Sequence, residues 1–199
     1  MDDESYFPAD LSQVPGVKFY HTSDKTAINK QLTIKNVEKY SSKFLVWQAI
    51  SSDGNRSKPF ITTGQAMNGK LYLQQCIQAR LLPFIDQYYQ CQNVLFWPDL
   101  ATAHYQKDVL ATLHQNGITV VPRNKNPPNL PQARPIERYW CLVKQVYQQR
   151  KKSANALNSF KRMYATDSRK VSHDTVRGLM DNVPKILRSI RYKGAYSQS

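Results

Sequence analysis

Several residue types that build familiar catalytic or binding sites are scarce in this chain of 199 residues. Glycine occurs only 7 times, and no group of glycines forms the loop that cradles phosphate groups. The 3 cysteines lack the spacing of zinc ligands, and such an odd, sparse set argues against a disulfide framework. The sequence also lacks a nucleophile elbow. P-loop, zinc and serine-hydrolase chemistry are therefore disfavoured.

Long hydrophobic runs are missing too. No apolar run approaches the roughly 18 residues that a membrane-spanning helix needs, and the first residues lack the apolar core of a signal peptide. Hydrophobic residues nevertheless make up 41% of the chain and aromatic residues 11%, which is typical of a globular protein. We expect an intracellular protein with one sizeable core and no membrane partner.

Negative charge is the remaining scarcity. The chain has 14 acidic residues against 28 lysines and arginines, which gives a net charge of +14. Because neutralising phosphates releases condensed counterions, such an excess favours a polyanionic partner. Charge alone does not separate this from a basic protein without such a partner. The basic residues are especially frequent from Arg123 onward.

The first half of the chain is dominated by strand signals. Phe19–His21 and Leu32–Ile34 are short candidate strands, and Phe44–Ile50 is a longer one. The polar sequence Ser51–Gly54 predicts a turn, from which Pro59–Thr62 returns as a hairpin partner.

Strands and helices then alternate. Residues Leu71–Tyr89 predict a long helix with a kink or break at Pro83. Val94–Trp97 is apolar without alternation, as in a central strand covered on both faces. A helix containing Val109 and Leu113 and a strand at Ile118–Val121 follow.

The last third predicts helices only. After a loop rich in proline and asparagine, the expected helices are Ile136–Gln149, Ala154–Tyr164, Thr175–Asn182 and Pro184–Arg191. Early strands, strand–helix alternation and a helical tail together predict a mixed α/β domain with helices packed on a sheet.

Three acidic residues stand out by their context. Asp99 directly follows an apolar strand, and Glu137 opens a predicted helix after a proline-rich loop. Taken alone, Asp99 is more often a turn or N-cap residue, and an acid in a first helical turn, such as Glu137, is ordinary. Together with Asp3 they would supply carboxylates from separate elements, as a site for paired divalent metals requires. His104 is a candidate for supporting such a site or contacting phosphate, although a partly buried histidine with a single hydrogen bond is the commoner case.

At this point the motifs resemble those of mariner-type transposases. Asp3–Phe7 is similar to their first acidic segment, and Val46–Gly54 to their Val-Trp-Gly-Ala-Ile strand and its turn. Asp99–His104 is similar to their Asp-Asn-Ala-Pro-x-His segment, with leucine and threonine in place of asparagine and proline. Pro128–Trp140 resembles their Asn-Pro-Ile-Glu-x-x-Trp segment. The segments occur in the family's order through nearly the whole chain.

The resemblance implies a ribonuclease H-like fold, in which helices flank a mixed β-sheet and a helical tail follows. It implies a DDE triad of Asp3, Asp99 and Glu137, which would hold two Mg²⁺ or Mn²⁺ ions roughly 4 Å apart. The implied activity is DNA strand cleavage and strand transfer in cut-and-paste transposition and DNA integration. The implied partners are transposon ends, target DNA and a second copy in a homodimer. A nuclear location and no small-molecule cofactor follow from the same resemblance.

The implied organisation has residues 1–150 as the catalytic domain, with an incomplete first strand, and residues 151–199 as its helical extension. We expect the family's helix-turn-helix domains to be absent, as in a truncated copy. The candidate DNA-binding residues are Arg123, Lys125, Arg134, Arg138, Lys144, Arg150, Lys151 and Lys152. An inactive remnant, a co-opted DNA-binding module without catalysis, and a cellular nuclease of the same fold are the alternatives that the sequence leaves open.

Overall fold

A computed structural model describes residues 1–11, 42–64, 66–128, 130 and 133–194. The predicted strands at Phe19–His21 and Leu32–Ile34 lie outside the described residues. None of the helices in the described part of the chain is long and apolar enough to cross a membrane.

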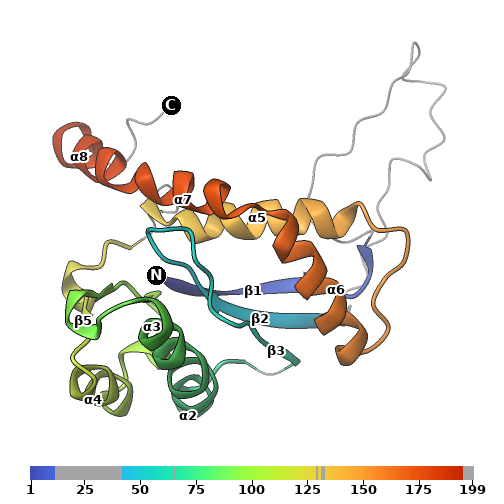
Figure 1. Ribbon diagram of the computed structural model, residues 1–199, viewed down its shortest axis with the longest axis horizontal. Helices are drawn as coiled ribbons and strands as arrows, with labels where there is room; N and C mark the ends of the chain where they lie inside the picture. Colours follow the sequence, from blue (N-terminus) through green and yellow to red (C-terminus); the bar gives the residue numbers. More distant parts are fainter. Residues whose placement is uncertain (12–41, 65, 129, 131–132, 195–199) are drawn as a thin grey trace.

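An antiparallel sheet lies at the centre of the molecule (Figure 1). Its strands are β1 (Asp2–Pro8), β2 (Lys43–Ala49) and β3 (Phe60–Thr63), in the order β1-β2-β3. The predicted hairpin of β2 and β3 is thereby confirmed. Its turn contains Gly54 at a φ of +90°, a backbone conformation that residues with a side chain rarely adopt. A Cβ at Gly54 would also lie 2.5 Å from the carbonyl oxygen of His173, so the turn and the C-terminal helices approach closely there.

Alternating side chains of the sheet enter two separate cores. On one face, Phe7 of β1 packs edge-on against Trp140 and Tyr164, and Phe44 of β2 stacks on Phe160 with ring centroids 4.2 Å apart. The helices that cover this face are α5 (Pro135–Gln148), α6 (Leu157–Lys170) and α7 (His173–Asp181).

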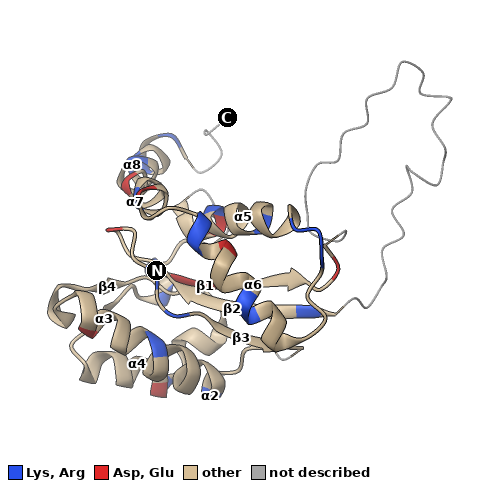
Figure 2. Ribbon diagram, turned by 45° about the vertical axis from the view of Figure 1, so that its right-hand side comes forward, with Lys and Arg blue, Asp and Glu red and all other residues tan. Residues whose placement is uncertain are grey.

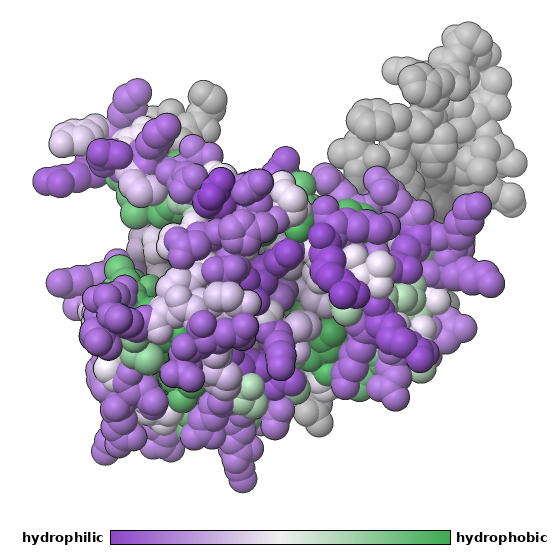
Figure 3. Space-filling view, in the orientation of Figure 1, coloured by the Kyte–Doolittle hydropathy of each residue, from purple (hydrophilic) through white to green (hydrophobic). Residues whose placement is uncertain are grey.

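The last helix, α8 (Val183–Lys193), stands out from the body beside α7 (Figure 3). The four predicted C-terminal helices are therefore present as α5 to α8. α6 begins later and ends later than its apolar pattern indicates, at Leu157 and Lys170.

The opposite face of the sheet packs on a long helical segment. The segment consists of α2 (Gly69–Leu71), the π-helix η2 (Tyr72–Leu81) and α3 (Leu82–Tyr88), and it contributes to a core around Trp47. The expected kink or break at Pro83 is not a break, because the chain remains helical through this residue. The wider π turns precede it, and Pro83 lies in the first turn of α3.

A second, smaller sheet completes this core. β4 (Leu95–Phe96) pairs in parallel with β5 (Thr119–Val120), and α4 (Lys107–Gln115) connects them. As the sequence predicts, the helix ends at Asn116-Gly117, where Gly117 has a φ of +73°. The prediction that Val94–Trp97 is covered on both faces is wrong. Phe96 is buried, but Leu95 is 64% exposed, because the core lies on only one side of this short strand.

The buried amide of Gln48 joins the sheet to two helices. Its Oε1 atom accepts hydrogen bonds from the hydroxyls of Tyr139, at 2.9 Å, and Tyr164, at 2.6 Å. Its Nε2 atom donates to the carbonyl of Ser57 at 2.7 Å. One side chain therefore satisfies two buried hydroxyls, which belong to α5 and α6.

Gln48→Leu is expected to destabilise the protein because it leaves both hydroxyls without this acceptor. An unsatisfied buried polar group costs about 1–3 kcal/mol, so the free energy of unfolding should fall by on the order of 2 kcal/mol or more. Urea unfolding measures it, with Gln145→Leu on the exposed side of α5 as the control. Equal stabilities of the two variants would contradict the assignment.

Candidate active site

The three predicted carboxylates come from three different elements. Asp3 is the second residue of β1, Asp99 follows β4, and Glu137 lies in the first turn of α5. Figure 2 shows the acidic start of β1 close to α5. Carboxylate oxygens of Asp3, Asp99 and a further acid, Glu4, all lie within 4.8 Å of one another. Glu137 is exposed and is not a member of this tight group among the described residues, although its charge acts on Asp3.

Asp3 is buried and faces α5. Its Oδ2 atom accepts a hydrogen bond of 3.1 Å from the indole Nε1 of Trp140, one helical turn after Glu137. Burial is the main cause that raises the pKa of Asp3 to about 8, and the carboxylates of Glu137 and Asp99 raise it further. Arg134 and a backbone hydrogen bond from Glu4 oppose this rise. The arrangement therefore favours either a proton or a cation beside Asp3.

Arg134 holds the parts of the site together. Its guanidinium donates to the carbonyl oxygens of Pro98, at 3.2 Å, and Asp2, at 3.0 Å, and lies 3.7 Å from Asp99 Oδ1. It thus links β1, the segment after β4 and the start of α5. Arg134 is 8% exposed, so its position fits this internal role better than the predicted contact with DNA.

His104 connects two of the acidic segments. Its Nε2 lies 2.9 Å from Glu4 Oε1, and its Nδ1 lies 3.2 Å from the backbone carbonyl of Asp99. Both partners are acceptors when Glu4 is ionised, so the ring then carries both protons. Burial lowers the pKa of His104, but the carboxylates of Asp2, Glu4 and Asp99 and the hydrogen bond to Glu4 outweigh it and raise the pKa to about 9.

A fifth acid, Asp2, lies on the same face of β1 as Glu4. It is completely buried, and its Oδ2 atom accepts from Trp47 Nε1 at 2.8 Å and from the hydroxyl of Tyr72 at 2.6 Å. The Tyr72 ring stacks on His104 with centroids 4.0 Å apart. Among the described residues, the other oxygen of Asp2 has no hydrogen-bond partner. The negative charge of Asp2 thus helps to hold a positive charge on His104.

The predicted DNA-binding residues occupy several places. Arg138 is exposed on α5 beside Glu137, and Lys144 is half-buried on the same helix with Nζ 5.4 Å from the centre of the Phe7 ring. Arg150 forms a double hydrogen bond with Asp167, which ties the end of α5 to α6. The remaining candidates, all exposed, are Arg123, Lys125, Lys151 and Lys152.

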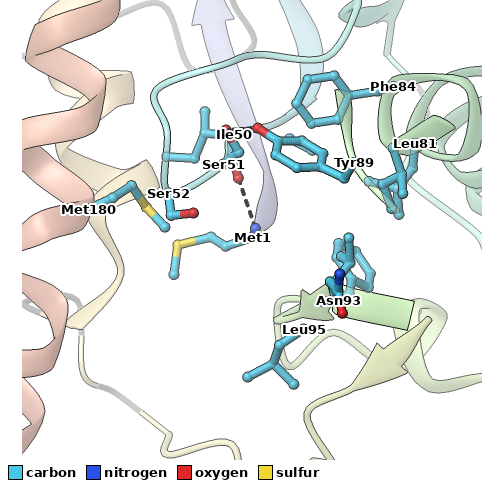
Figure 4. Close-up of a pocket in the computed structure, with 14 residues that line it drawn as sticks. Met1, Ile50, Ser51, Ser52, Leu81, Phe84, Tyr89, Asn93, Leu95 and Met180 are labelled. Atoms are coloured by element: carbon cyan, nitrogen blue, oxygen red, sulfur yellow. Dashed lines mark hydrogen bonds between the residues drawn. The ribbon is translucent and has the colours of Figure 1, made fainter. Parts of the chain in front are cut away.

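A cavity of about 170 Å³ is lined by none of these carboxylates (Figure 4). Met1, Ile50, Phe84, Leu95 and Met180 line it, together with other residues that include no carboxylate, histidine, lysine, arginine or cysteine. It therefore lacks the carboxylate, imidazole and thiolate ligands that a metal site requires.

Sequence reasoning missed Glu4 and Asp2 as parts of the site. Both lie in the acidic segment that begins the chain, and the alternation of a strand would have placed them together on the face opposite Asp3. The contact between Glu4 and His104 could not be predicted from the sequence, because the two residues are 100 positions apart.

The donor set fits a divalent cation. Clustered carboxylate oxygens are the ligands that Mg²⁺ and Mn²⁺ prefer, and the described group contains no thiolate that would favour softer metals. Burial is the main cause of the raised pKa of Asp3, and the charges of Glu137 and Asp99, which raise it further, are also charges that attract a cation.

Comparison with known proteins identifies the fold. No protein-family model matches the chain, and no curated protein matches it. The chain in the crystal structure of the Mos1 mariner paired-end complex with Mn matches with a TM-score of 0.77 and 14% identity, over 100% of this chain and 56% of that chain. The Mos1 mariner transposase catalytic domain matches with a TM-score of 0.63 and 18% identity, over 83% and 80% of the two chains.

The catalytic domain solved with Raltegravir and Mn matches with a TM-score of 0.64 and 16% identity, over 80% of this chain and 78% of that chain. This chain spans about half the length of the chain in the paired-end complex. Its mixed α/β fold is that of the Mos1 catalytic domain, as the motif resemblance implied.

The raised pKa of Asp3 predicts how the stability of the metal-free protein depends on pH. The folded protein keeps the Asp3 proton up to about pH 8, whereas a carboxyl at the ordinary pKa of 3.8 loses it near pH 4. The unfolded chain therefore binds fewer protons in this window, and the Asp3 contribution to the free energy of unfolding falls as the pH rises from about 4 to about 8.

Asp3→Asn should remove this fall. Each tenfold change in proton affinity corresponds to about 1.4 kcal/mol. At pH 8 the free energy of unfolding of the variant should therefore exceed that of the wild type by on the order of a few kcal/mol. Thermal unfolding in EDTA across this pH range measures the effect, with Asp86→Asn on the exposed side of α3 as the control. Identical pH slopes for Asp3→Asn and wild type would refute the environment assigned to Asp3.

Proposed function

We propose that this chain is the catalytic domain of a mariner-type DDE transposase with a ribonuclease H-like fold. Its activity would be metal-dependent DNA strand cleavage and strand transfer. The observation that carries the proposal is the meeting of Asp3 and Asp99, with the charge of Glu137 beside them, on the fold of a transposase catalytic domain. The four motif segments in the family's order support it independently.

In this proposal Asp3, Asp99 and Glu137 hold two Mg²⁺ or Mn²⁺ ions. Structures of the Mos1 catalytic domain with Mn and with Mg support the choice of metal. Such ions activate a water or a 3′-hydroxyl for in-line attack on a phosphodiester and stabilise the leaving oxygen. The exposed carboxylate of Glu137 would complete the site on the solvent side, where DNA approaches.

The other residues prepare the carboxylates for this task. A bound cation would take the place of the Asp3 proton, which would pass to solvent, and the Trp140 indole donates to one of the Asp3 oxygens. Arg134 holds the backbone around Asp2 and Pro98, so β1 and the segment before Asp99 keep their spacing. These contacts orient the ligands before DNA arrives, and such orientation is what positioning in catalysis requires.

Exposed and half-buried basic residues would bind the DNA backbone. Arg138 lies next to Glu137, and Lys144 follows on the same helix, so both are near the proposed reaction centre. The Mos1 paired-end complex with the left transposon end supports transposon ends as a partner, and the Mos1 strand transfer complex is consistent with target DNA as the other. A homodimer and a nuclear location belong to the same proposal.

Residues 1–150 and 151–199 would act as one catalytic unit. Phe160, Tyr164 and Val176 of the C-terminal helices pack into the same core as Phe7 of β1, the strand that carries Asp3. The helical extension therefore supports the strand on which the site depends.

Nicking of supercoiled plasmid DNA by the purified chain in Mn²⁺ tests the proposal. Asp99→Asn should lower the nicking rate about 100-fold or more, because a neutral amide cannot replace a charged metal ligand. Asp86→Asn is the matched control and should match the wild type. DNA binding without nicking by the wild type would instead favour a non-enzymatic DNA-binding module.

A further inference from the structure

Glu4 lies very close to Asp3 and Asp99. Its carboxylate belongs to the group whose oxygens lie within 4.8 Å of one another, and its side chain is 15% exposed. Like charges so close together repel each other, and a cation between them removes the repulsion. The triad alone gives no reason for a further carboxylate at this place.

The contacts of Glu4 leave part of its carboxylate free for a ligand. Oε1 is engaged by Nε2 of His104, a completely buried side chain. A carboxylate offers about four lone-pair sites, so one bond to His104 fixes its orientation without consuming its capacity. Because β1 alternates, Glu4 approaches Asp3 and Asp99 from the side of His104, opposite the side of Trp140 and α5.

His104 is itself held from several directions. Nδ1 contacts the carbonyl of Asp99, so one ring touches both the backbone of one acid and the side chain of another. Tyr72 stacks on the ring and anchors its own hydroxyl on Asp2, and Asp2 is held in turn by Trp47. The imidazole therefore has little freedom to rotate, and it fixes the separation between Glu4 and Asp99.

We propose that Glu4 supplies an additional carboxylate ligand to the cation between Asp3 and Asp99, and that His104 is the positioning residue that holds Glu4 and the Asp99 backbone in place. This inference rests on the proposed function, because it adds residues to that metal site. Residues that orient metal ligands typically change metal affinity 10–100-fold when they are replaced.

Titration of the metal-free chain with Mn²⁺ tests this inference without any need for catalysis. Free Mn²⁺ is followed by its electron paramagnetic resonance signal. Glu4→Gln, which keeps the shape and can still accept from His104, should raise the Kd for Mn²⁺ about tenfold or more. Glu4→Asp keeps the charge but is one methylene shorter, so it should weaken binding as well.

Two replacements of His104 separate its contacts. The amide of glutamine can occupy the place of Nε2 and keep the contact with Glu4, whereas that of asparagine can occupy the place of Nδ1 and keep only the contact with Asp99. His104→Asn should therefore weaken Mn²⁺ binding about tenfold or more, and His104→Gln should weaken it much less. His114→Asn, at an exposed position in α4, is the control and should leave the Kd unchanged.

Folding is checked by circular dichroism and by unfolding in EDTA, and comparisons use variants that fold. A wild type that binds no Mn²⁺ overturns the metal site of the proposed function and this inference with it. A wild type that binds Mn²⁺ and loses binding in Asp99→Asn, while Glu4→Gln and Glu4→Asp bind as the wild type does, overturns the role of Glu4 alone. Equal, unchanged affinities in both His104 variants overturn the role of His104.

Discussion

The structure depends on keeping carboxylates of like charge together at one place. Asp3, Glu4 and Asp99 converge there, and the charge of Glu137 adds to their repulsion. The protein offsets part of this cost with three donors of different kinds. These are the Trp140 indole beside Asp3, the His104 imidazole beside Glu4, and the Arg134 guanidinium close to Asp99. A divalent cation would offset the remaining repulsion between the carboxylates, so the arrangement is suited to bind one.

The first strand makes this arrangement geometrically possible. Because its side chains alternate, Asp3 and Phe7 face the helices α5 and α6, while Asp2 and Glu4 face Tyr72 and His104. Each face has a separate hydrophobic core, and β1 and β2 contribute to the layer between the two. A displacement of β1 would therefore disturb the acids and both cores at once.

Much of the fold could be predicted from the sequence. The hairpin of β2 and β3, the cap at Gly117 and the C-terminal helices follow from local patterns that the structure confirms. Leu95 could not be predicted, because a short apolar run does not say whether one or both faces will be covered. The contacts of Arg134 and His104 could not be predicted from the sequence either. Each of these residues joins segments that are far apart in sequence and meet only in the folded chain. Family-like motifs singled out Asp3, Asp99 and Glu137 as candidates, but gave no indication of the residues that contact them.

The most direct test of this account is the anomalous scattering of Mn²⁺ in crystals of the metal-free chain that have been soaked with the ion. The account predicts an anomalous peak between the carboxylates of Asp3 and Asp99. The distance from the peak to the carboxylate oxygens should be about 2.0–2.2 Å, as for small divalent ions that prefer oxygen ligands. An oxygen of Glu4 should coordinate the same ion, and the Glu137 carboxylate should approach this ion from the solvent side. Saturating Mn²⁺ that leaves this position empty, or that collects only at unrelated surface acids, would contradict the account.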